Sequence, residues 1–381
     1  PRSTLFPYTT LFRSLVDEEG RNVYRMLWKY AIDEMEHGGA DVFCYELFNE
    51  PSYSDTSELN RNEFKKYLIV KYENINALNK IWNSKYKDFA EVVHFSTPYE
   101  YGALLVEWKK FLQKQFVALC IEGRDYIHGR CKNANTTGMP AKYVSVQPLN
   151  GTVISTWANI DFYSLNKEMD IVNKGTGGSE YKSDNVNHDD TPVIDAVNPC
   201  NKLAKAIFTG KAALTIADKK PIASSEAYFG SSAHSFRDSL WTEIVRGSSI
   251  IYLWSWSKGD VGQGKVSKES ALRYPYLLLN HHAIAPEVIT KAVNDSREEV
   301  ELLKDFFMHR ARVPEPKIAV LLSIPTERYE MSGKNPRYFN NVLDAAMCLE
   351  FNHYQYDVLY EEDLARSEEH TSELQSPNTI S

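Results

Sequence analysis

A short apolar run at residues 41–48 (DVFCYELF) ends at two polar residues, Asn49 and Glu50. Pro51 follows, and because proline cannot donate a hydrogen bond to a sheet ladder, it helps to end a strand here. A buried strand that ends in an amide and a carboxyl group can present an acid to a substrate at the rim of a barrel. We therefore expect Asn49 and Glu50 to belong to an active site. The structural alternatives are a loop hydrogen bond for Asn49 and a helix cap or a surface ion pair for Glu50.

A second glutamate stands at the end of another apolar segment. Residues 221–226 (PIASSE) read as a strand that ends at Glu226, and residues 227–230 (AYFG) lead into a loop that contains Tyr228. In a barrel of parallel strands the carboxyl ends open on one face, so Glu50 and Glu226 can converge there. Two carboxyl groups about 5–5.5 Å apart, one protonated and one ionised, are what a retaining glycosidase uses. The residues thus point to cleavage of a glycosidic bond.

Aromatic residues offer a surface for a sugar ring. The chain has 23 tyrosines and 7 tryptophans, and Trp254 and Trp256 lie near the end of the apolar segment 248–256. A tryptophan face can pack on the apolar side of a pyranose. Strand alternation puts both tryptophans on one face, with Trp254 toward the interior and Trp256 at the rim. We count both, together with Tyr228, as substrate-binding candidates, with an ordinary place in the core as the alternative.

Strand and helix signals alternate along the chain, which favours βα units around a parallel sheet. Apolar residues at helical spacing predict helices at 21–37, 61–82, 104–130, 162–169, 199–209, 234–246 and 296–310, the last with Ser296 as its N-cap. Short apolar runs predict strands at 41–48, 142–147, 170–173, 221–226 and 248–256.

The pattern restarts after Pro314 and Pro316. Residues 317–323 (KIAVLLS) read as a buried strand, followed by a helix at 336–350 and an edge-like strand at 356–359. We therefore divide the chain into a partial catalytic domain at 15–312 and the start of a second α/β domain at 317–365.

The two ends of the chain do not read as part of the fold. Residues 4–14 (TLFPYTTLFRS) and 366–376 (RSEEHTSELQS) are similar to translated sequencing adapters, so residues 1–14 and 366–381 are set aside as artefacts. The natural segment then starts inside a gene, and its localisation is unknown. Five scattered cysteines, with no C-x-x-C pair, slightly favour a reducing compartment such as the cytoplasm.

Several classes of partner are not expected. A net charge of -8 without a basic stripe argues against nucleic acid, and no apolar stretch is long enough to cross a membrane. The polar loop at 182–192 (KSDNVNHDDTP) lacks the fixed spacing of a calcium loop, and no histidine stands at metal-ligand spacing. We expect neither a metal nor a cofactor.

Together these residues resemble the clan A glycoside hydrolases, which are (β/α)8 retaining enzymes. In that clan an Asn-Glu pair ends barrel strand 4 with the acid/base, and a glutamate ends strand 7 with the nucleophile. The resemblance implies that Asn49 and Glu50 stand on strand 4 with Glu50 as acid/base, and that Glu226 on strand 7 is the nucleophile. The implied fold is α/β, the C-terminal part of a TIM barrel (strands 4–8) followed by a flavodoxin-like α/β domain.

Two families within the clan compete. The segment at 45–51 (YELFNEP) is similar to the strand-4 signature of the family 5 cellulase-type enzymes. The segments at 64–92, 107–120, 247–256 and 317–323 are closer to the family 42 β-galactosidases. Family 42 implies a retaining β-galactosidase that acts on a β-galactoside or related oligosaccharide, with a flavodoxin-like domain that helps to build a homotrimer in the full-length protein. A family 5-type β-glucanase or mannanase, or a non-catalytic carbohydrate-binding barrel, is the alternative.

This assignment leaves strands 1–3 of the barrel outside the chain. An open sheet has an unpaired edge and an uncovered apolar face. We therefore expect the chain alone to be inactive and prone to aggregate, and the full protein to be a glycosidase.

Overall fold

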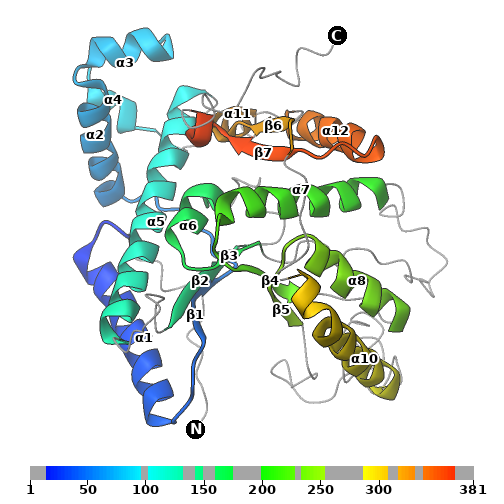
Figure 1. The fold of residues 1–381 in the computed structure, drawn as a ribbon. Coiled ribbons are helices and arrows are strands. Elements are labelled where there is room, and N and C mark those ends of the chain that lie inside the picture. The colour runs from blue at the N-terminus through cyan, green and yellow to red at the C-terminus, as the bar shows by residue number, and fades with distance from the viewer. Residues whose placement is uncertain are drawn as a thin grey trace, which may run out of the picture. The chain divides into compact units, whose positions relative to one another are not determined.

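The computed structural model describes residues 14–95, 102–131, 142–148, 159–174, 199–227, 233–253, 286–307, 316–330 and 338–364. They fall into two compact units, one from 1–170 and 323–339 and the other from 171–322 and 340–381. Helices and parallel strands alternate along both (Figure 1), so the predicted α/β class is confirmed. Apart from Ser14, the adapter-like ends lie outside the described residues.

The first unit contains a parallel pair of strands, β1 (Cys44–Asn49) and β2 (Tyr143–Gln147). The register pairs Cys44 with Tyr143 and Asn49 with Gln147, and it shifts between Glu46 and Asn49. Among the described residues, the helices of this unit are α1 (Glu18–His37), α2 (Glu58–Tyr72), α3 (Ile75–Trp82), α4 (Phe89–Val93), α5 (Ala103–Arg130), α6 (Phe162–Glu168) and α11 (Ile324–Glu330).

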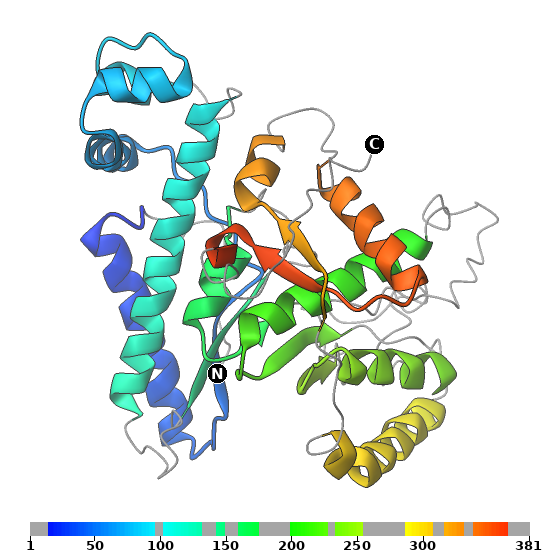
Figure 2. The same cartoon turned by 45° about the horizontal axis from the view of Figure 1, so that its top comes forward.

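Helix α5 is the centre of the first unit, and it lies beside α1 in both views (Figure 2). Its buried stripe, which includes Trp108 and Phe116, has the helical spacing seen in the sequence. The ring centroids of Phe116 and of Phe48 on β1 lie 5.2 Å apart. A Cβ atom added to Gly123 would lie 2.9 Å from Cζ2 of Trp28 on α1. The helices and the strand therefore meet at a residue that must be small.

The segment predicted as one helix at 61–82 forms two helices. Helix α2 ends at Tyr72 and α3 begins at Ile75. Between them Glu73 has a φ of 63°, and the side chain of Asn74 accepts a hydrogen bond (2.9 Å) from the N–H of Ala77. The prediction of one continuous helix is wrong because Asn74 is a good N-cap, and such a short polar break leaves the apolar period undisturbed.

The second unit contains three parallel strands in the order β3 (Val172–Asn173), β4 (Ile222–Ala227) and β5 (Ile250–Leu253). A separate parallel pair is formed by β6 (Ala319–Leu322) and β7 (Asp357–Tyr360). The described helical elements are α7 (Pro199–Ala217), α8 (Ala233–Val245), α10 (Pro286–Asp305), α12 (Tyr338–Phe351), whose first two residues belong to the first unit, and the short 3-10 helix η4 (Glu361–Asp363).

Helix α10 begins well before the predicted start at 296. Its first residue is Pro286, and Ser296 lies inside the helix with only 1% of its surface exposed. The prediction of Ser296 as an N-cap is therefore wrong. Proline suits the first helical position, because an N–H group at that position would have no intrahelical partner and its absence costs nothing.

Candidate active site

Glu50 follows the last residue of β1 in an unusual backbone conformation. Its φ of 47° lies in the left-handed region, which residues other than glycine rarely adopt. Its N–H donates a hydrogen bond (2.9 Å) to the carbonyl oxygen of Gln147 at the end of β2. The register shift of β1 comes just before it, and the side chain of Glu50 is half-buried while that of Asn49 is exposed. A local irregularity at the strand end therefore presents both side chains.

The loop that follows Glu50 is tied down by buried polar side chains, which we call the Tyr53 anchor: Tyr53, Asn60, Gln115 and Asn159. The Tyr53 hydroxyl donates to Oε1 of Gln115 (2.8 Å), and Nε2 of Gln115 donates to Oδ1 of Asn60 (2.8 Å). Nδ2 of Asn159 donates to the carbonyl oxygen of Tyr53 (2.7 Å). The Tyr53 anchor was not predicted from the sequence, because the two residues joined by each of these hydrogen bonds are 55 to 106 positions apart in the chain. The only sequence signal was the closeness of Tyr53 to Glu50.

Glu226 is the next-to-last residue of β4, close to its predicted place at a strand end. The register of β4 with β5 shifts between Ser224 and Ala227, so the irregular part of the strand includes Glu226. The preceding residue, Ser225, is buried and donates a hydrogen bond (2.6 Å) to Oδ1 of Asn173 on β3. The side chain of Glu226 lies outside the described part of the structure, and so do the remaining predicted site residues, Tyr228, Trp254 and Trp256.

The two candidate carboxyl groups share one local pattern. Each stands at the carboxyl end of a parallel strand, where the register with the next strand is interrupted. Register irregularities of this kind often re-aim a side chain beside an active site. Glu50 belongs to the first unit and Glu226 to the second, so their convergence stays a prediction.

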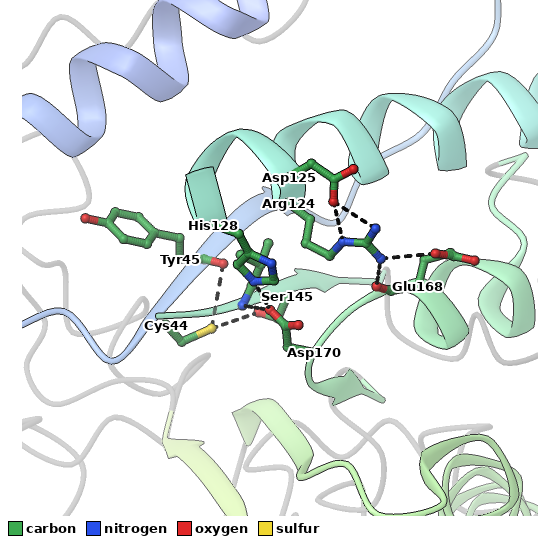
Figure 3. A network of polar contacts seen from close by, with 9 residues as sticks. Cys44, Tyr45, Arg124, Asp125, His128, Ser145, Glu168 and Asp170 are labelled. Atoms are coloured by element: carbon green, nitrogen blue, oxygen red, sulfur yellow. Dashed lines mark hydrogen bonds and ion pairs between the residues drawn. The ribbon is translucent and has the colours of Figure 1, made fainter. Parts of the chain in front are cut away.

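Another polar group lies near the opposite end of β1 and β2 (Figure 3). Sγ of Cys44 donates to Oγ of Ser145 (3.5 Å), and Nε2 of His128 lies 2.9 Å from Oδ2 of Asp170. Burial raises the pKa of Cys44 to about 11, so its thiol is a poor nucleophile near neutral pH. At about 3.3 Å per residue, β1 separates Cys44 from Glu50 by roughly 20 Å. We therefore do not assign this group to the active site.

The described residues give no sign of a metal centre. Among them, no group of three or more His, Cys, Asp or Glu side chains could hold a metal ion. Cys44, Cys120 and Cys348, which lie in the described part, are free cysteines. None of the described helices is long and apolar enough to cross a membrane.

Comparison with known families identifies the relatives of the chain. The model of glycoside hydrolase family 42, described as β-galactosidase, matches residues 22–272. The chain belongs to this family. The matched residues of this family-42 chain include Asn49, Glu50 and Glu226, and the resemblance to family 42 seen in the sequence is confirmed.

Solved structures show that the fold of this family-42 chain is shared at low sequence identity. The β-galactosidase from Bacillus circulans sp. alkalophilus aligns with a TM-score of 0.67 and 15% identity, over 92% of this chain and 50% of that chain. A catalytic mutant of a GH42 β-galactosidase from G. stearothermophilus aligns with a TM-score of 0.61 and 16% identity, over 92% and 50%. The exo-carrageenase GH42 from Bacteroides ovatus aligns with a TM-score of 0.55 and 16% identity, over 83% and 41%. The chain spans half or less of the length of these proteins. A search of curated proteins found no match.

Proposed function

We propose that the protein is a retaining β-glycosidase of the β-galactosidase type, with Glu50 as acid/base and Glu226 as nucleophile. The observation that carries the proposal is that a single family-42 match spans both β1 and β4, at whose carboxyl ends these glutamates stand. Binding of a sugar alone would require neither carboxyl group, whereas double displacement requires both.

The proposed reaction has two steps. The carboxylate of Glu226 attacks the anomeric carbon while the carboxyl group of Glu50 donates its proton to the leaving oxygen, and the glycosidic bond breaks. Glu50, now ionised, then takes a proton from water as the water oxygen attacks the same carbon and releases Glu226. The sugar leaves with its original anomeric configuration. Asn49 would hold the hydroxyl beside the reacting carbon, in a contact that can strengthen in the transition state.

The proposal also assigns the strands. We take β1 to β5 as strands 4–8 of a (β/α)8 barrel within a catalytic domain at 15–312, and β6 as the first strand of a flavodoxin-like domain at 317–365. The parallel order of the strands and the half-length coverage of the family structures support this assignment. Tyr228, Trp254 and Trp256 would then line the substrate site, and the full-length protein would form a homotrimer.

The proposed substrate is a terminal β-galactoside. The likeness to an exo-carrageenase within the same family favours carrageenan as a second substrate to be tested. Hydrolysis of a β-glucan or a mannan without hydrolysis of a β-galactoside would support the family 5-type alternative. Binding of an oligosaccharide without turnover would support a non-catalytic barrel.

The roles of the two glutamates can be tested in the longest natural reading frame that contains residues 15–364. Glu226→Ala should lose activity on dinitrophenyl β-galactoside by orders of magnitude, and azide should restore it with α-galactosyl azide as the product. Glu50→Ala with azide should instead yield β-galactosyl azide, because azide then replaces water in the second step. If Glu226→Ala gave the β-azide and Glu50→Ala gave the α-azide, the two roles would be reversed. A rate near that of the wild type in Glu226→Ala would remove Glu226 from the mechanism.

A further inference from the structure

We propose that the Tyr53 anchor is a positioning device for the carboxyl group of Glu50. The inference rests on the proposed role of Glu50 as acid/base. Tyr53 touches no reacting atom in this proposal, so it is a positioning residue.

The backbone of Glu50 needs an external restraint. Its φ of 47° places Cβ close to the following carbonyl oxygen, which is unfavourable for an L-residue. The next residue is Pro51, whose ring disfavours the helical region in the residue before it and favours an extended conformation. A strained conformation of this kind persists only where the surrounding structure fixes it.

The Tyr53 anchor supplies that restraint from two helices. Tyr53 is 1% exposed, and its hydroxyl is bonded to Gln115 of α5, which is bonded in turn to Asn60 of α2. The amide of Gln115 accepts at one end and donates at the other, so its orientation is fixed. Asn159 holds the carbonyl oxygen of Tyr53 as well, and the residue is therefore fixed at both its side chain and its backbone.

Asn60 also holds the far end of the same loop. Its side chain is fully buried, and Nδ2 donates a hydrogen bond (2.7 Å) to the carbonyl oxygen of Asp55. Ser57 then caps α2 by accepting a hydrogen bond (3.2 Å) from the N–H of Asn60. The loop is thus tied at Tyr53 and at Asp55, so the short stretch between Glu50 and Tyr53 has little freedom to relax. A movement of Tyr53 must be transmitted to Glu50.

The expected chemical consequence is selective. A misplaced acid slows the departure of a leaving group that needs a proton, and it matters little for a leaving group that departs as a stable anion. A purely structural role of Tyr53 would slow all substrates alike through loss of folded protein.

The first test uses Tyr53→Phe in the natural reading frame, because this change removes only the hydroxyl. We expect kcat/KM to fall about 10-fold or more for methyl β-galactoside and less than about 3-fold for dinitrophenyl β-galactoside. Glu50→Gln is the reference and should show the same selectivity. If Glu50→Gln lacks it, the proposed function fails. If Glu50→Gln shows it but Tyr53→Phe slows both substrates equally, the positioning role fails.

The second test needs no activity and uses the same natural reading frame. The Glu50 N–H, bonded to Gln147, reports whether the strand end is held, and its hydrogen exchange can be followed by mass spectrometry or NMR. We expect about 10-fold faster exchange at Glu50 in Tyr53→Phe. Tyr67→Phe is the matched control, since the Tyr67 hydroxyl also donates to a side chain of α5, that of Glu107 (2.9 Å). Equal exchange at Glu50 in the two variants would overturn the inference.

Discussion

The Nζ atom of Lys174 lies 2.7 Å from Oε2 of Glu243, and the two side chains are 0% and 2% exposed. The same carboxylate oxygen accepts a hydrogen bond (2.7 Å) from the hydroxyl of Ser248. Lys174 follows β3 and Glu243 belongs to α8, so the pair holds that helix against the β3–β4–β5 sheet. Burial lowers the pKa of Lys174 from its ordinary value, although the neighbouring Glu243 carboxylate opposes the shift.

Removing one partner of this buried pair should destabilise the protein more than removing both charges together. Lys174→Met leaves the Glu243 carboxylate buried without its nearest cation, and we expect a loss of about 3 kcal/mol in the free energy of unfolding. Lys174→Met combined with Glu243→Gln should be more stable than the single variant by about 1–2 kcal/mol, since no buried charge of the pair remains and the amide oxygen can still accept from Ser248. Urea denaturation measures both. A double variant that is as unstable as the single one would contradict this reading of the pair.

The close contact at Gly123 gives a second prediction. In Gly123→Ala the new Cβ would lie 2.9 Å from Cζ2 of Trp28 and 3.0 Å from both methyl groups of Leu47. The variant should lose about 1–3 kcal/mol in the free energy of unfolding, because the rigid indole ring must move. Gly129→Ala on the same helix has no neighbouring atom within 4 Å and should be neutral or up to about 1 kcal/mol more stable. Equal effects of the two substitutions on the thermal midpoint would exclude the steric explanation.

The raised pKa of the Cys44 thiol predicts that the folded protein loses stability at alkaline pH. Burial raises its pKa from 9.0 to about 11, so above pH 9 the folded state holds a proton that the unfolded state releases. The protonated thiol therefore contributes fully to the free energy of unfolding below pH 9, and this contribution is lost as the pH rises to about 11. Its size is up to about 2.7 kcal/mol, at 1.36 kcal/mol per pKa unit. Cys44→Ala should flatten the fall in the free energy of unfolding between pH 9 and pH 11. An unchanged slope in this variant would assign the alkaline loss to other groups.

The left-handed backbone of Glu50 predicts that glycine at this position gives a more stable protein than alanine. Alanine normally stabilises a strand more than glycine does, but at a φ of 47° the Cβ atom is unfavourable. We expect Glu50→Gly to be more stable than Glu50→Ala by about 1 kcal/mol in urea denaturation. Both variants lack the carboxyl group, so the comparison isolates the backbone. If Glu50→Ala were the more stable of the two, the left-handed conformation would not be a source of strain.

The local elements could largely be predicted from the sequence. The strand predicted at 142–147 is observed at Tyr143–Gln147, the one at 221–226 at Ile222–Ala227, and the helix at 104–130 at Ala103–Arg130. These elements are long or strongly periodic, and their apolar spacing is a local property. The early start of α10 and the break between α2 and α3 were not predicted, since both depend on single capping positions.

The sequence by itself determined the alternation of strands and helices and the two glutamates at strand ends, because each of these follows from residues that are near neighbours in the chain. The tertiary structure decided the left-handed backbone of Glu50, the Tyr53 anchor that surrounds it, and the buried Lys174–Glu243 pair. Each of these depends on side chains that only folding brings together. Their energies come from burial and from completed hydrogen bonds, and neither can be read from local spacing.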